Sequence, residues 1–264
     1  MLTEKYNMVR RAFTVLFIIL MAFFLVLIFI FPILTSSLRA PVQSQSLISP
    51  YWAGYSVASD LINPQPHVTG VSASWTVPTV KVSIGNSFSA AWIGIGGRFD
   101  ETLIQAGTKQ DSIDGVGTYA AWYELLPKNS VTIDSLKVSP GDRITVSISL
   151  LNRTTNTCSI EISDITNGQT FKKNFVYDSS MLSAEWIVER PTTRTSISSL
   201  TDFGQVTFTN CTARIGDKVG DISSFPSSLF TMVSRMNTES MEGLCATVLP
   251  PSSGGSSFTV KYGQ

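Results

Sequence analysis

Alternation of apolar and polar residues, from residue 50 onward, is the feature that most restricts what this chain can fold into. In Ile144-Thr-Val-Ser-Ile-Ser-Leu150 every second residue is aliphatic, and the residues between are Thr or Ser. A period of two indicates a β-strand with one buried face, and no convincing helical period interrupts it. The same pattern gives the inward residues of further expected strands: Val71, Ala73, Trp75 and Val77; Val206 and Phe208; Phe258, Val260 and Tyr262.

Turn-forming residues separate these runs, as in Asp114-Gly115, Ser139-Pro-Gly-Asp142 and Thr166-Asn-Gly168. Many short strands with regular punctuation predict an all-β domain of antiparallel sheets, either a sandwich or a barrel. Residues 50–264 are too many for an immunoglobulin-type sandwich of about 100 residues. We therefore expect a two-sheet antiparallel sandwich of the jelly-roll type, without a second domain.

An uncharged run, residues 12–34, precedes this domain and is rich in Phe, Leu and Ile. As a helix it would be roughly 34 Å long, enough to cross a hydrocarbon core of about 30 Å. Lys5, Arg10 and Arg11 lie before it, which predicts a cytoplasmic N-terminus and an extracytoplasmic domain. The small residues Ser36, Ser37 and Ala40 leave cleavage, and hence secretion, as an alternative.

The expected organisation thus has four parts. Each follows from the charge and hydropathy of the segment. They are a cytoplasmic segment at 1–11, a transmembrane helix or uncleaved signal anchor in the lipid bilayer at 12–34, a Ser-, Gln- and Pro-rich tether at 35–49, and the β-sandwich domain at 50–264.

The composition excludes several kinds of chemistry. His67 is the only histidine, so a Ser-His-Asp triad would depend on it, and zinc sites with two histidines cannot form. The 19 basic residues balance 19 acidic ones, so the chain has no net positive charge that would favour binding of nucleic acid. We therefore expect a monomer without metal or cofactor, whose chemistry uses carboxylates, amides, hydroxyls or aromatic rings. Three cysteines outside the cell (Cys158, Cys211 and Cys245) permit one disulfide in three possible pairings, with one thiol left over.

Strand alternation also predicts which polar side chains project together. The side chain of Gln105 projects from the opposite side of its strand to those of Ile104 and Ala106. Glu185 and Glu189 project from the same side of their strand. The other residues expected on such polar sides are Trp92 with Gly94 and Gly96, and Trp122 with Glu124. A sheet carrying all of them would present tryptophans, an amide and carboxylates across a groove with a glycine floor. The simpler alternative is a solvated sheet face, although exposed tryptophans favour a binding surface.

A series of short segments runs in a recognisable order through residues 51–210. They are Tyr51-Trp-Ala-Gly-Tyr55, Val71-Ser-Ala-Ser-Trp-Thr-Val-Pro78, Ala91-Trp-Ile-Gly-Ile-Gly-Gly97, Leu103-Ile-Gln-Ala-Gly107, Gly117-Thr-Tyr-Ala-Ala-Trp-Tyr-Glu124, Val138-Ser-Pro-Gly-Asp142, Ala184-Glu-Trp-Ile-Val-Glu189 and Asp202-Phe-Gly-Gln-Val-Thr-Phe208. Each is a weak pattern alone. Together they resemble the glutamic peptidases, or eqolisins (peptidase family G1, formerly A4).

This resemblance implies a concanavalin A-like sandwich of two curved sheets, with a cleft on the concave face that takes a polypeptide. It also implies a catalytic pair, Gln105 and Glu185. The carboxylate would act as general base and then as acid, and the amide would stabilise the oxyanion. Trp92, Trp122, Glu124 and Glu189 are expected to contact substrate, with Glu189 beside the cleft or at its rim.

The sequence departs from the family pattern at Gly96 and Ala120, where many members have aspartate. The soluble part, residues 50–264, carries 15 basic and 18 acidic residues, a net charge of −3. Because the familiar secreted members of the family are more one-sidedly acidic, we expect a working pH that is less extreme than theirs. Two other functions stay open. One is a glycosidase that uses Glu185 with Glu124 or Glu189. The other is a non-catalytic β-sandwich that binds peptide or glycan in the same cleft.

Overall fold

The computed structural model describes residues 21, 42–192, 197–236, 241–252 and 254–263. Met1–Pro41 and Val42–Gln264 are separate units, and the second holds the β-strands. The predicted cytoplasmic segment and the predicted membrane helix, 12–34, lie outside the described residues apart from residue 21. Within the part that is described, no helix has both the length and the apolar character needed to span a bilayer.

The described residues of the second unit are almost entirely strands and loops, with one short 3₁₀ turn, which confirms the all-β prediction. The elements are β1 (Ser44–Ser49), β2 (Trp52–Ala58), β3 (Val68–Thr76), β4 (Ala90–Gly96), β5 (Leu103–Ile113), β6 (Val116–Leu125), β7 (Val131–Thr132), β8 (Arg143–Asn152), β9 (Thr157–Asp164), β10 (Gln169–Val176), β11 (Ser183–Glu189), β12 (Gln205–Ile215), β13 (Lys218–Gly220), η1 (Ile222–Ser224), β14 (Ser227–Met236), β15 (Met241–Val248) and β16 (Phe258–Tyr262).

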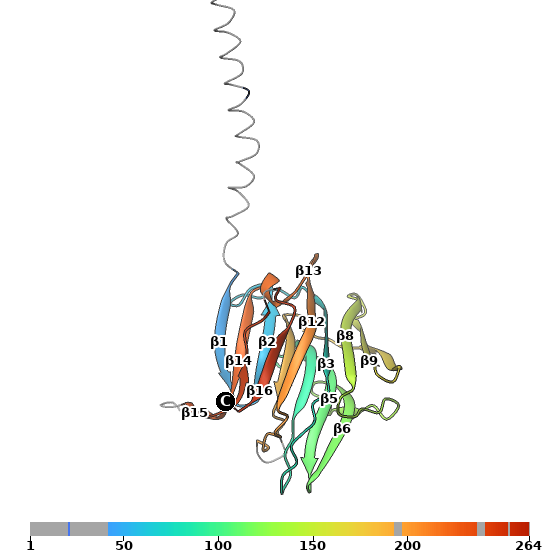
Figure 1. Cartoon of the computed structure of the whole chain (residues 1–264). Coiled ribbons are helices and arrows are strands. Elements are labelled where there is room, and N and C mark those ends of the chain that lie inside the picture. The colour runs from blue at the N-terminus through green and yellow to red at the C-terminus, as the bar shows by residue number, and fades with distance from the viewer. Residues whose placement is uncertain (1–20, 22–41, 193–196, 237–240, 253, 264) are drawn as a thin grey trace, which may run out of the picture. The chain divides into compact units, whose positions relative to one another are not determined.

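The strands pair in the order β10-β9-β8-β3-β12-β16-β15-β14-β2-β11-β4-β5-β6-β7. Strand β12 belongs to two sheets, because Gln205–Phe208 pairs with β16 while the part from Thr209 onward pairs with β3. Strands β3 and β8 of one sheet lie against β4, β5 and β11 of the other. Figure 1 shows β8 and β9 at one edge of this arrangement and β1, β14 and β2 at the other. The molecule is therefore sandwich-like, as predicted.

The core lies between the two sheets and follows the predicted alternation. On β8 the side chains of Ile144, Val146 and Ile148 are fully buried, and the inward residues of β3 and β12 are buried with them. Tyr262 differs from the prediction, since it is 38% exposed. It lies at the end of β16, one residue beyond the last residue paired with β12, so no opposing strand covers it.

The turn at Asp114-Gly115 is a two-residue hairpin between β5 and β6. Asp114 has φ of 49° and Gly115 has φ of 80°. Positive φ at both central residues is characteristic of a type I′ turn, whose twist matches that of the two strands of a hairpin. Asp-Gly is one of the preferred sequences for this turn. This turn sets the β5–β6 register, and that register positions Gln105 and Glu124.

The tether predicted for 35–49 is described only from residue 42, and its last six residues form β1. This strand pairs in parallel with β14, so the sheet is not purely antiparallel. Gln45 on β1 donates a hydrogen bond to the Ser228 hydroxyl at 2.8 Å. The chain therefore joins the sheet before residue 50.

All three cysteines are free thiols, so the disulfide expected from the sequence is absent. They lie on β9, β12 and β15, and no two of these strands pair with one another. Cys158 and Cys211 are fully buried. Burial raises the pKa of Cys158 to about 11, which keeps this thiol protonated and unreactive.

Candidate active site

Six residues form one row across the sheet that contains β2, β4, β5, β6, β11 and β14. Directly paired residues of neighbouring strands project from the same face. The row, from β14 through β2, β11, β4 and β5 to β6, is Ser228, Ser56, Glu185, Gly94, Gln105 and Glu124. We call the side of the sheet that carries these side chains the site face. The predicted placement of Gln105 and Glu185 on one face is confirmed.

Gly94 separates the carboxyl group of Glu185 from the amide of Gln105. Two strand spacings put the Cα atoms of these two residues about 10 Å apart, within reach of two side chains that lean toward a shared ligand. A Cβ atom on Gly94 would come within 2.7 Å of Leu103 Cδ1 and 3.0 Å of Trp92 Cζ3. The side chains of Leu103 and Trp92 therefore pack directly over Gly94, and only glycine leaves room for them there, so the predicted glycine floor is covered by apolar side chains.

Glu185 is the most buried acid of the site face, with no exposed surface. Neither of its carboxylate oxygens has a hydrogen-bond partner among the described residues. Burial raises the pKa of Glu185 well above its ordinary value, while the nearby Ser183 hydroxyl and, after it, the charge of Arg98 act in the opposite direction. A buried carboxyl group without partners costs free energy, so its retention points to a role in chemistry.

Gln105 is 4% exposed, and its Nε2 donates a hydrogen bond to Glu124 Oε2 at 2.7 Å. The amide oxygen of Gln105 has no partner in the described part of the chain. Burial raises the pKa of Glu124, and the hydrogen bonds from Gln105 and from the Ser130 backbone oppose that rise. Glu124 thus orients the Gln105 amide. The second N–H and the carbonyl oxygen of that amide can then bind a further ligand.

The next row contains the two predicted tryptophans, since Trp92 pairs with Gly107 and Gly107 with Trp122. Trp92 is fully buried and Trp122 is 6% exposed, so the expectation of exposed rings on an open groove is wrong. Their rings pack with other apolar side chains of the site face, because large rings on neighbouring strands cover one another. This second hydrophobic cluster consists of Ala90, Trp92, Leu103, Trp122, Ile187 and Phe230, with Leu47, Trp52 and Leu126 packed against it.

Glu189 accepts a hydrogen bond from the indole nitrogen of Trp92 at 2.7 Å. Burial, opposed by the hydrogen bond from Trp92 and assisted by the nearby charge of Glu124, raises the pKa of Glu189 to about 7. A pocket of about 350 Å³ opens here, with Trp122, Glu124 and Glu189 in its lining. Three of the four predicted substrate contacts therefore share one pocket, while Gln105 and Glu185 lie outside its lining.

Two charged residues near the site were missed from the sequence. Asp111 lines the same pocket, and burial raises its pKa to about 6. It lies on the site face because it is six residues from Gln105 along β5, so the alternation could have identified it. Arg98 lies in the loop after β4, where no periodic pattern predicts the direction of a side chain.

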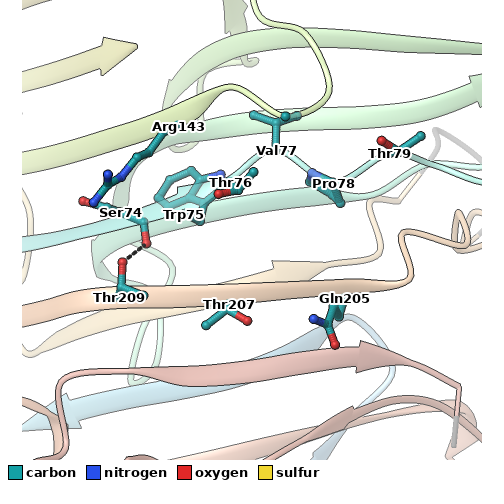
Figure 2. Close-up of a pocket in the computed structure, with 11 residues that line it drawn as sticks. Ser74, Trp75, Thr76, Val77, Pro78, Thr79, Arg143, Gln205, Thr207 and Thr209 are labelled. Carbon is teal, nitrogen blue, oxygen red and sulfur yellow. Dashed lines mark hydrogen bonds between the residues drawn. The ribbon is translucent and has the colours of Figure 1, made fainter. Parts of the chain in front are cut away.

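A second pocket, of about 530 Å³, lies on the solvent-facing side of β3, β8 and β12. Figure 2 shows its polar side chains, with Thr207 and Gln205 opposite Thr76 and Thr79. The Thr209 hydroxyl donates a hydrogen bond to the Ser74 carbonyl at 3.1 Å. The pocket has no carboxylate and none of the predicted site residues in its lining, so it offers no acid–base chemistry. Across the described residues, no group of three or more histidines, cysteines or acids is arranged to hold a metal ion.

Residues 50–262 match the sequence model of the Peptidase A4 family. Aspergillopepsin-2 of Aspergillus niger is 31% identical over 189 residues, which are 62% of this chain and 64% of the relative. Scytalidopepsin B of Scytalidium lignicola is 35% identical over 127 residues, or 45% of each chain. The chain therefore spans less than two thirds of the length of either relative.

A solved structure of scytalido-glutamic peptidase with a transition state analog inhibitor has a similar fold. The TM-score is 0.65 at 23% identity, and the match covers 81% of this chain and 98% of the other. At this level of identity the likeness shows the fold alone.

Proposed function

The chain belongs to the peptidase A4 family, the glutamic peptidases, and we propose that its β-sandwich domain is an endopeptidase in which Glu185 and Gln105 act together on water. The observation that supports this most strongly is the placement of a buried, unpartnered carboxyl group and a buried amide on either side of Gly94. The three groups that amide hydrolysis requires are a base for water, an acid for the leaving nitrogen and a donor for the oxyanion.

In the proposed reaction Glu185, as carboxylate, takes a proton from a water molecule held between it and Gln105. The oxygen of that water attacks the peptide carbonyl carbon and gives a tetrahedral intermediate. The Gln105 amide donates a hydrogen bond to the oxyanion, and because an amide does not titrate it keeps this role in acid. Glu185 then returns the proton to the leaving nitrogen as the C–N bond breaks, which regenerates the carboxylate.

The remaining site residues have supporting roles in this proposal. Glu124 holds the amide of Gln105 in one orientation through the 2.7 Å hydrogen bond. Trp122, Glu124 and Glu189 line the neighbouring pocket and would contact the polypeptide, while Trp92 would act through its hydrogen bond to Glu189.

The test is incubation of the purified chain with denatured protein across a range from about pH 2 to about pH 6, followed by mass spectrometry of the peptides. Internal cleavage, insensitive to pepstatin, is the expected result. Binding of peptide without cleavage at any pH would instead support a non-catalytic binding module. Two observations favour that alternative: Glu185 is fully buried, and Gly96 and Ala120 stand where many family members have aspartate. Cleavage of oligosaccharides would support a glycosidase. That alternative is the weakest because Gln105 lies between Glu185 and Glu124 in the row.

We also propose that residues 12–34 anchor this peptidase in a membrane, with residues 1–11 in the cytoplasm and the domain outside. The proposal rests on the length of the uncharged run and on the basic residues before it. Fractionation of cells that express the chain, with protease added from outside, tests both location and orientation. Recovery of the domain in the medium would show that the anchor is cleaved, and recovery in the cytoplasm would refute the proposal.

A further inference from the structure

Arg98 is held over the site face by the loop that joins β4 to β5. The loop begins at Gly97, where a Cβ atom would lie 3.3 Å from Cη2 of Trp52. The guanidinium carbon of Arg98 lies 5.0 Å from the centre of the Phe99 ring and 5.6 Å from that of Phe230. Phe230 and Trp52 both belong to the hydrophobic cluster of the site face. The cation is therefore held above this face by aromatic rings, a favourable arrangement for a guanidinium.

The guanidinium lacks the partner that such a group normally has. Its Nε is buried and has no hydrogen-bond partner in the described part of the chain. Glu185, whose two oxygens also have no such partner, is the acid whose charge acts on Arg98. Arg98 and Glu185 thus interact through their charges, with no direct hydrogen bond between them in the described part of the chain.

The other groups that face Glu185 leave Arg98 as its cationic neighbour. The paired strands present Ser56 on β2 and Gly94 on β4, and Gln105 follows on β5, all without charge. Ser183, two residues before Glu185 on β11, is also uncharged, and its hydroxyl favours the ionised carboxylate. The acids nearby are Asp100 in the same loop as Arg98, Glu124 on β6, and Glu189 four residues along β11. Each of these, when ionised, disfavours a charge on Glu185. Among the described residues only Arg98 is a cation whose effect on Glu185 is resolved.

We propose that Arg98 is a positioning residue for Glu185, the proposed base. Its guanidinium supplies the counter-charge that keeps Glu185 ionised while substrate excludes water from the site. The loop holds this residue beside Phe230, which belongs to the hydrophobic cluster of the site face. Arg98 would thereby shift the acid limit of activity to lower pH than a fully buried glutamate could reach alone. This inference rests on the proposed function only for its kinetic test.

The kinetic test compares pH profiles of kcat/KM for the full chain and its Arg98→Gln and Arg98→Lys variants. Removal of the cation should move the acid limb of the profile upward by about one pH unit, while lysine should restore most of the shift. Arg143→Gln is the matched control, since Arg143 is an exposed arginine on the opposite side of the sandwich. A profile of unchanged shape in Arg98→Gln, lowered equally at every pH, would mean that Arg98 only packs the loop, and the inference would be overturned.

A second readout is independent of activity. The Glu185 carboxyl carbon can be followed by NMR in glutamate-labelled protein, with Glu185→Gln used to assign its signal. The titration midpoint should rise by about one unit in Arg98→Gln and stay unchanged in Arg143→Gln. Equal midpoints in wild type and Arg98→Gln would refute the inference. If the wild-type chain cleaves no peptide, the proposed function fails, and this titration still decides whether Arg98 sets the charge of Glu185.

Discussion

Glu185 on β11 and Gln105 on β5 each pair with the same residue, Gly94 on β4, from opposite sides. The two side chains therefore project from one face of the sheet, and Gly94 itself contributes no side chain between them. They are 80 positions apart in the sequence, yet the register of three strands brings them together. This relationship is the basis of the proposed mechanism, and the predictions below test its parts.

Gln105→Ala should lower kcat by about 10²–10³-fold, because it removes one donor from the oxyanion. KM should change little if the amide acts mainly in the transition state. Steady-state kinetics on a fluorogenic peptide measure this, and circular dichroism verifies that the variant is folded. Glu161→Gln is a suitable control, since Glu161 is a surface residue in an ion pair with Lys172. An effect on KM alone would indicate that Gln105 only binds substrate.

Gly94→Ala should displace the side chains that pack over this glycine, between the base and the amide. The added methyl group would meet Leu103 and Trp92 at or below 3.0 Å, so the domain should lose about 1–3 kcal/mol of stability. Displacement of the catalytic groups should lower kcat/KM by on the order of 10²-fold. Gly254→Ala is the control, because a Cβ atom there meets nothing within 4 Å. Full activity in the folded Gly94→Ala variant would show that the packing over Gly94 does not position the catalytic groups.

The domain should become less stable as the pH rises from about 4 to about 8. Burial raises the pKa of Asp111 to about 6 and that of Glu189 to about 7. The folded chain therefore holds these protons more tightly than the unfolded chain, whose carboxyl groups titrate near pH 4. The free energy of unfolding falls as the pH passes from the unfolded to the folded pKa, by on the order of 3 kcal/mol for the shift at Asp111.

Denaturant titrations at several pH values measure this slope. Glu189→Gln removes one of the titrating groups, so it should flatten the pH dependence of the unfolding free energy while leaving the stability near pH 4 almost unchanged. A domain that gains stability between pH 4 and pH 8 would contradict the assignment of raised pKa values to these buried acids.

Trp92→Phe should destabilise the domain more at neutral pH than in acid. The substitution removes the indole N–H that bonds Glu189 at 2.7 Å, so the ionised carboxylate loses a donor. We expect a loss of about 1–3 kcal/mol above pH 7. Trp75→Phe is a matched control, because the Trp75 indole donates to the neutral Thr108 hydroxyl at 3.0 Å. The loss of unfolding free energy caused by Trp75→Phe should not vary with pH. An equal pH dependence of this loss in both variants would contradict the prediction.

Much of this architecture could be predicted because it depends on local patterns. Alternation located the inward residues of β3 and β8, and the Asp-Gly pair located the β5–β6 hairpin. Alternation also gave the common direction of Glu185 and Glu189, since period two follows from the backbone of one strand. The pairing of β11 and β5 with the two edges of β4 could not be derived in this way, because strand order depends on long-range contacts. The family resemblance supplied that connection.

The misses have equally specific causes. Whether Trp92 is exposed depends on the rings that pack around it, which come from β2 and β14 and not from its own strand. Residues 44–49 were assigned to a tether because their uncharged Ser- and Gln-rich composition hides a strand that pairs in parallel with β14. The direction of Arg98 is set by a loop, and a disulfide requires proximity that cysteine counting cannot provide.

The most direct test of the central claim is cleavage of a denatured protein by the wild-type chain and by Glu185→Gln, measured side by side at the pH of maximal activity. The substitution keeps the size of the side chain but removes its ability to accept and return a proton. The account predicts that the wild type cleaves internal peptide bonds and that the folded variant loses at least about 10³-fold in kcat. Cleavage by Glu185→Gln at a rate close to that of the wild type would contradict it.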